Sequence, residues 1–131
     1  MRLLLDTHIW IWSLVDPARL TPRVRGALQD AKTEVWLSPI SVWEAILLAE
    51  RGRLALEPDP ASWVREQLAT GLFREAALTW DVAVESRRLA LEHDDPADRF
   101  IAATARVHDL TLVTSDTRLL RGSGFAVLAN V

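Results

Sequence analysis

The chain begins with the stretch Arg2-Leu3-Leu4-Leu5-Asp6-Thr7-His8, in which three leucines run directly into an aspartate. A short apolar run that stops at a polar residue is typical of a strand buried on both faces of a parallel sheet. After Asp6 the pattern changes, and residues 7–15 are long enough for a helix. In open α/β sheets, ligands bind outside the carboxyl ends of the strands. Asp6 is therefore either a helix cap or the first member of a site.

Length and composition narrow the class of protein. The 131 residues predict a single domain, residues 1–131, with its own core. The net charge of −3 argues against a protein that binds nucleic acid through its overall charge. A bound divalent metal would, however, reverse the sign of the local charge where it binds. The chain has no cysteine, which excludes disulfides and zinc sites built on thiolates. Without a signal peptide or an apolar run near the ~20 residues that span a bilayer, we expect a cytoplasmic protein with no membrane segment.

Segments typical of strands and helices alternate along the chain. The predicted strands are residues 3–5, 34–37, 73–78, 111–114 and 125–128. Helix starts are expected at Thr21-Pro22, Ser38-Pro39, Asp59-Pro60, Thr79 and Asp95-Pro96. This alternation predicts an α/β fold in which a mostly parallel sheet is covered by helices on both faces. No Gly-rich phosphate loop is present.

Glu44 has two open interpretations. The pattern Ser41-x-x-Glu44 matches a capping box, in which the glutamate reaches back to the backbone N–H of Ser41. If Ser38 is instead the cap and Pro39 the first helical residue, Glu44 lies in the second turn as a free carboxylate.

Three aspartates further along the chain present the same choice. Asp95 would cap a helix, and Asp98 would complement the helix dipole. Asp98 leads, however, into the small residues at 101–105, which let a helix approach its neighbours closely and would hold Asp98 deep in the crevice. Asp116 follows a predicted strand and is either a cap or a site residue.

The acids at the strand ends and helix starts would all point to one edge of the sheet. Two unit charges ~5 Å apart repel by roughly 3 kcal/mol at an effective dielectric constant of ~20. Four carboxylates gathered there therefore require protonation, arginine partners or a cation. All-oxygen ligation with few protein donors suits Mg²⁺ or Mn²⁺.

At these residues the chain resembles the PIN-domain ribonucleases, and within them the VapC-type toxins of type II toxin–antitoxin systems. The segments that carry the resemblance are Leu3-Leu4-Leu5-Asp6-Thr7-His8 with Trp10 and Trp12, Ser38-Pro39-Ile40-Ser41-Val42-Trp43-Glu44, Asp95-Pro96-Ala97-Asp98-Arg99-Phe100-Ile101-Ala102-Ala103-Thr104-Ala105, and Leu110-Thr111-Leu112-Val113-Thr114-Ser115-Asp116. They follow the family's order and spacing over nearly the full chain. The resemblance implies a three-layer PIN-like α/β domain with a central, mostly parallel sheet of about five strands flanked by helices.

The resemblance also implies an activity and partners. Asp6, Glu44, Asp98 and Asp116 match the family's acidic catalytic and metal-binding site, whereas Asp95 lies outside this quartet. The family cleaves RNA with Mg²⁺ or Mn²⁺, and its toxins are held inactive by a cognate antitoxin. A homodimer is implied as well.

Phosphodiester hydrolysis needs an activated water and stabilised oxyanions, which one or two divalent ions supply. We expect Asp6 and Asp98 to ligate the principal metal ion, and Glu44 and Asp116 to ligate a second ion or to hold metal-bound waters. The hydroxyl groups expected to support these ligands by hydrogen bonding are those of Thr7, Thr114 and Ser115.

Arg99 and the three histidines are not assigned to the expected site. Arg99 either contacts a phosphate or faces away from the site. His8 is interpreted as a partly buried residue at a helix start, and His93 and His108 show no ligand spacing. The expected mechanism requires no histidine.

Six tryptophans are many for a chain of this length. Trp10 with Leu14, and Trp43 with Leu47, stand at i, i+4 spacing, which predicts packing in the core. Trp12 lies off the face of Trp10 and suggests a partner surface. We expect Trp12 to become more buried when an antitoxin segment binds in an apolar groove.

Other functions are compatible with parts of the pattern. The first is a PIN-like nuclease of RNA maturation, and the second is a catalytically inactive interaction module. A phosphoacceptor receiver domain also gathers acids at strand ends, but it relies on a lysine after a late strand, and Lys32, the only lysine, is misplaced for that role.

Overall fold

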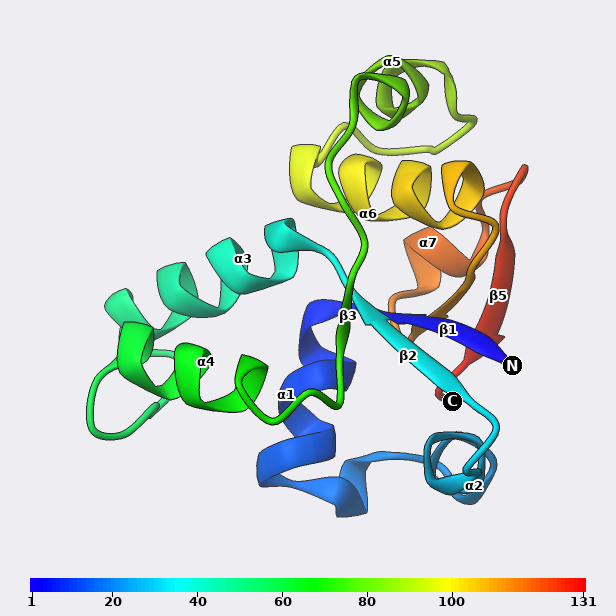
Figure 1. Ribbon diagram of the computed structural model, residues 1–131. Helices are drawn as coiled ribbons and strands as arrows, with labels where there is room; N and C mark the ends of the chain where they lie inside the picture. The colour runs from blue at the N-terminus through cyan, green and yellow to red at the C-terminus, as the bar shows by residue number, and fades with distance from the viewer.

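Strand β1 (Arg2–Leu5) lies at the centre of a five-stranded sheet in the computed structural model, which describes residues 1–131 (Figure 1). The strand order is β3-β2-β1-β4-β5, and every neighbouring pair is parallel. The remaining strands are β2 (Glu34–Leu37), β3 (Arg74–Glu75), β4 (Thr111–Thr114) and β5 (Ala126–Ala129). The predicted α/β class with a parallel sheet of about five strands is confirmed.

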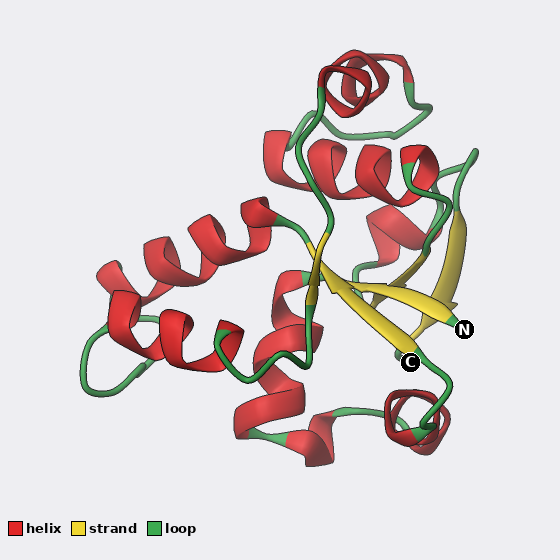
Figure 2. Ribbon diagram, viewed as in Figure 1, coloured by secondary structure: helices red, strands yellow, loops and turns green.

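Helices cover both faces of this sheet (Figure 2). They are α1 (Thr7–Val15), the 3₁₀ turn η1 (Pro17–Arg19), α2 (Pro22–Gln29), α3 (Pro39–Glu50), α4 (Pro60–Leu68), α5 (Trp80–Arg88), α6 (Pro96–Val107) and α7 (Thr117–Leu120). Helix α6 lies between the sheet and α5, whereas α1 and α2 lie on the opposite side (Figure 1). The longest helices, α3 and α6, have 12 residues each, and none has the length and apolar character needed to cross a membrane.

Alternate residues of β1 belong to different halves of the core. Leu3 and Leu5 pack in the same cluster as Trp10 of α1. Leu4 points the other way and joins the cluster that contains Ile101 of α6. All three leucines are at most 1% exposed, and burial of each side chain contributes about 1.5–3 kcal/mol. The strand that leads into Asp6 is therefore held from both faces.

Most element boundaries agree with the sequence prediction. Thr21, Ser38, Asp59 and Thr79 each cap a helix by accepting a hydrogen bond from a backbone N–H of its first turn.

The third strand is the clearest difference. Residues 73–78 were predicted to be extended and paired, but β3 has only two residues, both exposed. It is an edge strand that pairs only with β2, and the last bond of this pairing runs from the N–H of Ala76 to the carbonyl of Leu37 at 2.9 Å. Beyond Leu37 the chain of β2 enters the cap of α3, so residues 77 and 78 have no strand to pair with.

Candidate active site

A cavity of about 510 Å³ opens at the carboxyl edge of the sheet. The strands β1 and β4 end side by side there, and the N–H of Asp6 donates to the carbonyl of Val113 at 3.0 Å. All four acids expected to form a site line this cavity, together with Asp95. The other lining residues are His8, Ile9, Trp12, Leu48, Arg53, Ser115 and Arg118. The topology thus gathers side chains that are up to 112 positions apart in the sequence.

Asp6 both caps a helix and lines the cavity. Its Oδ1 accepts a hydrogen bond from the N–H of Thr7 at 2.9 Å and so caps α1. Its Oδ2 accepts a hydrogen bond from the hydroxyl of Thr114 at 2.6 Å. The residue is only 9% exposed, and this burial raises the pKa of its carboxyl against the opposing effect of the two hydrogen bonds. Asp6 is therefore a buried, rigidly held carboxyl group at the floor of the cavity.

Glu44 does not form the capping box. Ser38 caps α3 by accepting from the N–H of Ile40 at 3.0 Å, and Pro39, which lacks an N–H, occupies the first helical position. Glu44 is consequently free in the second turn, where its Oε1 accepts a hydrogen bond from the hydroxyl of Thr7. Partial burial raises the pKa of Glu44, and the nearby charge of Asp6 adds to the increase.

Asp98 lies in the first turn of α6 and faces the cavity. Asp95 caps this helix by accepting from the N–H groups of Ala97 and Asp98 at 3.0 and 3.4 Å. Burial raises the pKa of Asp98 to about 6, although a hydrogen bond from His93 opposes the increase. The negative charges of Asp6, Asp95 and Asp116 contribute further. The surroundings of Asp98 therefore disfavour the ionised form of its carboxyl group.

Asp116 is the exception among the four acids because it has a permanent cation beside it. Its Oδ1 accepts from the N–H of Arg118 at 2.8 Å, and its Oδ2 lies 3.1 Å from Nη2 of the same arginine. Burial works to raise the pKa of Asp116, but the hydrogen bonds and charge of Arg118 outweigh it, so the pKa falls below its usual value. The same Nη2 lies 3.7 Å from Oδ2 of Asp98. Arg118 therefore connects two of the acids, a contact that the sequence analysis did not identify.

Arg99 does not reach the cavity. It is buried, and it donates to the carbonyls of Ser86, Leu89 and His93 at 2.7, 2.8 and 3.2 Å. Its guanidinium is thus occupied by the last turn of α5 and the segment that joins α5 to α6, and the interpretation in which it contacts a phosphate is wrong.

The histidines also differ from expectation. His8 is exposed rather than partly buried, and it lines the cavity with its ring centroid 5.7 Å from that of Trp12. His93 lies with its Nε2 atom 2.8 Å from Oδ2 of Asp98, although the sequence showed no ligand spacing for it. Its position five residues before Asp98, in a loop that leads directly into the same helix, was the available signal.

Two of the three expected supporting hydroxyls contact the acids. Thr7 and Thr114 donate to Glu44 and Asp6. Ser115 instead donates to the carbonyl of Asn130 at 2.9 Å. The rigidity of the site therefore comes mainly from the first residue of α1 and the last residue of β4.

The tryptophans divide between core and surface. Trp10 is fully buried, as predicted, and its ring lies 5.7 Å from that of Trp63. Trp43 was expected in the core but is 56% exposed, because α3 turns Ser41 and Ala45 inward instead. Trp12 is half-buried and lines the acidic cavity.

The donor set of the cavity has a definite chemical preference. Five carboxyl groups offer oxygen ligands to this cavity. Two imidazoles are also near: His93 is directed at Asp98, and the ring of His8 lies against that of Trp12. Hard divalent cations prefer such oxygen donors, and Mg²⁺ in particular is bound through one or two carboxylates while keeping several waters. As placed here, no group of three or more His, Asp or Glu side chains is arranged to hold one metal ion. The residues present suit a cation held by few protein ligands.

Comparisons with known proteins identify the family of this chain. The model of the PIN domain family matches residues 3–124. Ribonuclease VapC22 of Mycobacterium tuberculosis is 38% identical over 117 residues, which are 88% of each chain. The structure of VapBC2 from Rickettsia felis bound to a promoter DNA fragment superposes with a TM-score of 0.72 at 14% identity, covering 98% of both chains. A toxin–antitoxin complex from Klebsiella pneumoniae gives a TM-score of 0.66 at 23% identity, also over 98% of both. The chain belongs to the PIN-domain family, and within it to the VapC ribonucleases.

Proposed function

We propose that this protein is a metal-dependent endoribonuclease and the toxin of a toxin–antitoxin pair. The observation that carries the proposal is the convergence of Asp6, Glu44, Asp98 and Asp116 on one cavity at the carboxyl ends of β1 and β4. The similarity to the ribonuclease VapC22 supports RNA as the substrate. The cytoplasm, where RNA is made and used, is the proposed location.

Asp6 and Asp98 are the proposed ligands of the principal ion, Mg²⁺ or Mn²⁺, because they are the most buried of the four acids. Glu44 and Asp116 would hold a second ion or metal-bound waters. When bound, such an ion supplies an activated water and neutralises charge on the attacking and leaving oxygens. The hydroxyls of Thr114 and Thr7 fix the carboxylates of Asp6 and Glu44 before any ion arrives, which reduces the cost of ordering them.

Arg118 would act on the substrate side of the same cavity. Its side chain is half exposed and already lies against two acids. A cation bound between those acids would compete with the guanidinium for their oxygens. Arg118 would then be free to bind a phosphate oxygen of the RNA, a contact for which a guanidinium is well suited.

Metal dependence is the direct test of the proposal. A 5′-labelled single-stranded RNA incubated with the purified chain should be cleaved internally in millimolar Mg²⁺ or Mn²⁺. Excess EDTA should stop cleavage, and added metal should restore it. Cleavage that continues undiminished in EDTA would contradict the mechanism.

A nuclease of RNA maturation with the same site is the principal alternative. The two functions differ in their effect on the cell rather than in chemistry. Growth arrest on expression, relieved by co-expression of a small neighbouring gene product, would favour the toxin. A protein that cleaves RNA but leaves growth unaffected would favour maturation.

A cognate antitoxin and a second copy of this chain are the proposed protein partners. Similarity to solved toxin–antitoxin complexes supports the first of them. Exposed Trp43 offers apolar surface for such contacts, with 56% of the residue accessible.

Replacing Trp12 should weaken the complex with the antitoxin. The ring lies beside the acidic cavity under the guanidinium of Arg19, 5.2 Å from it, and is half-buried in the free chain. We expect Trp12→Ala to reduce antitoxin affinity by roughly 10–30-fold, as for a central aromatic anchor. Calorimetric titration measures this, and Trp80→Ala is the matched control. Unchanged affinity, together with an unchanged fluorescence response to the antitoxin, would contradict the assignment.

A further inference from the structure

His93 is a nearly buried histidine next to the proposed metal ligand Asp98. Only 14% of its side chain is exposed, and its Nε2 lies 2.8 Å from Oδ2 of Asp98. The other ring nitrogen, Nδ1, is buried and has no hydrogen-bond partner. One edge of the ring therefore makes a short polar contact and the other makes none.

This asymmetry indicates which nitrogen carries the hydrogen. A neutral imidazole has one N–H donor and one acceptor nitrogen. A buried N–H without a partner is less readily tolerated than a buried acceptor without one. The hydrogen therefore belongs on Nε2, which donates it to Asp98.

The backbone of His93 is fixed by the helix that carries Asp98. Arg99, the residue after Asp98, donates to the carbonyl of His93 at 3.2 Å. The same guanidinium donates to the carbonyls of Leu89 and Ser86 at 2.8 and 2.7 Å. Three bonds from one buried side chain therefore hold the last turn of α5 and the segment that follows it, so the ring of His93 has little freedom to leave Asp98.

The two oxygens of Asp98 are consequently unequal. Oδ2 accepts the hydrogen from His93 and lies 3.7 Å from Nη2 of Arg118, whereas Oδ1 makes no hydrogen bond. Partners that hydrogen-bond a metal-binding carboxylate orient it and increase its affinity for the metal. We propose that His93 is a positioning residue that occupies Oδ2 of Asp98 and leaves Oδ1 free to bind the divalent ion. This inference rests on the proposed metal site.

The test compares the metal affinity of variants of the full chain. Mn²⁺ binding is measured from the electron paramagnetic resonance signal of the free ion during titration, in the absence of RNA. His93→Leu removes the donor, and we expect Mn²⁺ to bind roughly 10–100-fold more weakly. His93→Gln places an amide N–H at about the reach of Nε2 and should recover most of this loss.

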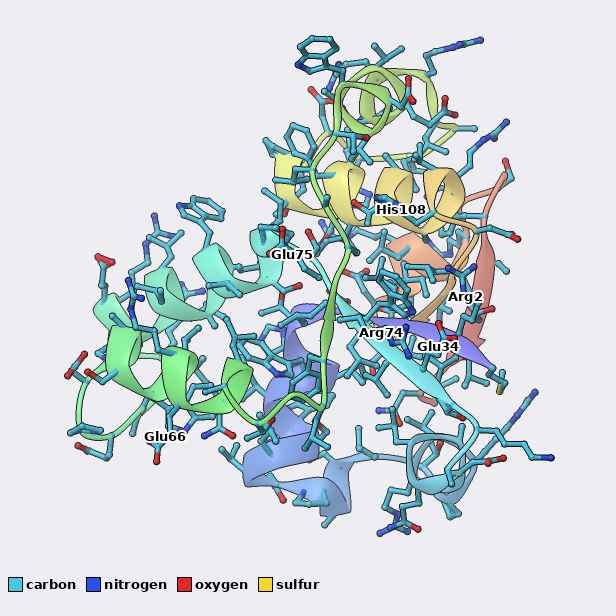
Figure 3. All side chains as sticks on the ribbon, in the orientation of Figure 1. Arg2, Glu34, Glu66, Arg74, Glu75 and His108 are labelled. Atoms are coloured by element: carbon cyan, nitrogen blue, oxygen red, sulfur yellow. The ribbon has the colours of Figure 1, made fainter.

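His108→Leu is the matched control. The Nε2 of His108 also makes one hydrogen bond, to the carbonyl of Ala77 at 2.9 Å, but it lies at the other end of α6 (Figure 3). We expect its Mn²⁺ affinity to equal that of the wild type. Thermal melting of each variant reports whether the fold is retained, and His93→Gln keeps the test informative if His93→Leu melts early.

RNA cleavage separates positioning from a direct role in the reaction. At saturating Mn²⁺ the kcat of His93→Leu should return to within a few-fold of the wild type, because only the metal concentration required has changed. A kcat that stays low at saturating metal would overturn the inference, as would wild-type Mn²⁺ affinity in His93→Leu or a failure of His93→Gln to recover it. If Asp98→Asn binds Mn²⁺ like the wild type, the proposed metal site itself is wrong.

Discussion

Asp6→Asn and Asp98→Asn are each expected to lower RNA cleavage by roughly 10³-fold or more, which corresponds to about 4 kcal/mol of lost transition-state stabilisation. An amide nearly matches the shape of the carboxylate but carries no charge, so it cannot hold a divalent ion with comparable strength. Initial rates under single-turnover conditions in saturating Mn²⁺ measure the effect. Full activity in both variants would contradict the proposed ligand set.

The same substitutions should leave the fold intact, which separates lost chemistry from lost structure. Asparagine is as good a helix cap as aspartate, so Asp6→Asn still accepts from the N–H of Thr7. It also removes a carboxyl group whose ionisation is disfavoured by burial. We therefore expect a melting temperature in EDTA that equals or exceeds the wild-type value. Glu66→Gln, on the exposed surface of α4 (Figure 3), is the control and should change neither property.

Much of the fold was predictable because its signals are local. Three consecutive leucines before Asp6 define the central strand, and capping residues followed by proline define the starts of α2, α3, α4 and α6. The length of β3 was not predictable in this way. It depends on where the neighbouring β2 ends, and the sequence of residues 73–78 carries no information about that.

The acids of the site were predictable for a related reason. Asp6 directly follows β1 and Asp116 lies two residues after β4, and parallel strands that are neighbours in a sheet end at the same edge. The contacts of Arg118 and His93 could not be derived, because each depends on how far a side chain reaches across the folded cavity. The burial predicted for Trp43 was wrong, because its i, i+4 spacing with Leu47 does not reveal which face of α3 turns inward.

The free energy of unfolding of the metal-free protein should decrease as pH rises from about 4 to about 7. Asp98 has a pKa of about 6 in the folded state against an ordinary value of 3.8. Below pH 3.8 the group is protonated in both states and carries no penalty. Between these values the unfolded chain releases the proton while the folded chain retains it, so stability falls until the pH passes about 6. Burial also raises the pKa values of Asp6 and Glu44, so these groups lower the stability with rising pH in the same way. The lowered pKa of Asp116 has the opposite effect on the stability.

The expected loss due to Asp98 is about 1–3 kcal/mol between pH 4.5 and pH 7.5, measured by urea unfolding in EDTA. Asp98→Asn should have a flatter profile, since the amide does not titrate, and Glu66→Gln should keep the wild-type slope.

A divalent ion that binds the ionised carboxylates should stabilise the protein at pH 7.5 and have little effect at pH 4.5. An identical slope in the wild type and Asp98→Asn would show that this carboxyl titrates normally in the fold. Stabilisation that is equal at both pH values would mean that the ion binds outside the acidic cavity. A penalty for burying these carboxylates in their ionised form, which disappears when metal binds, is the behaviour that distinguishes a metal site from a set of helix caps.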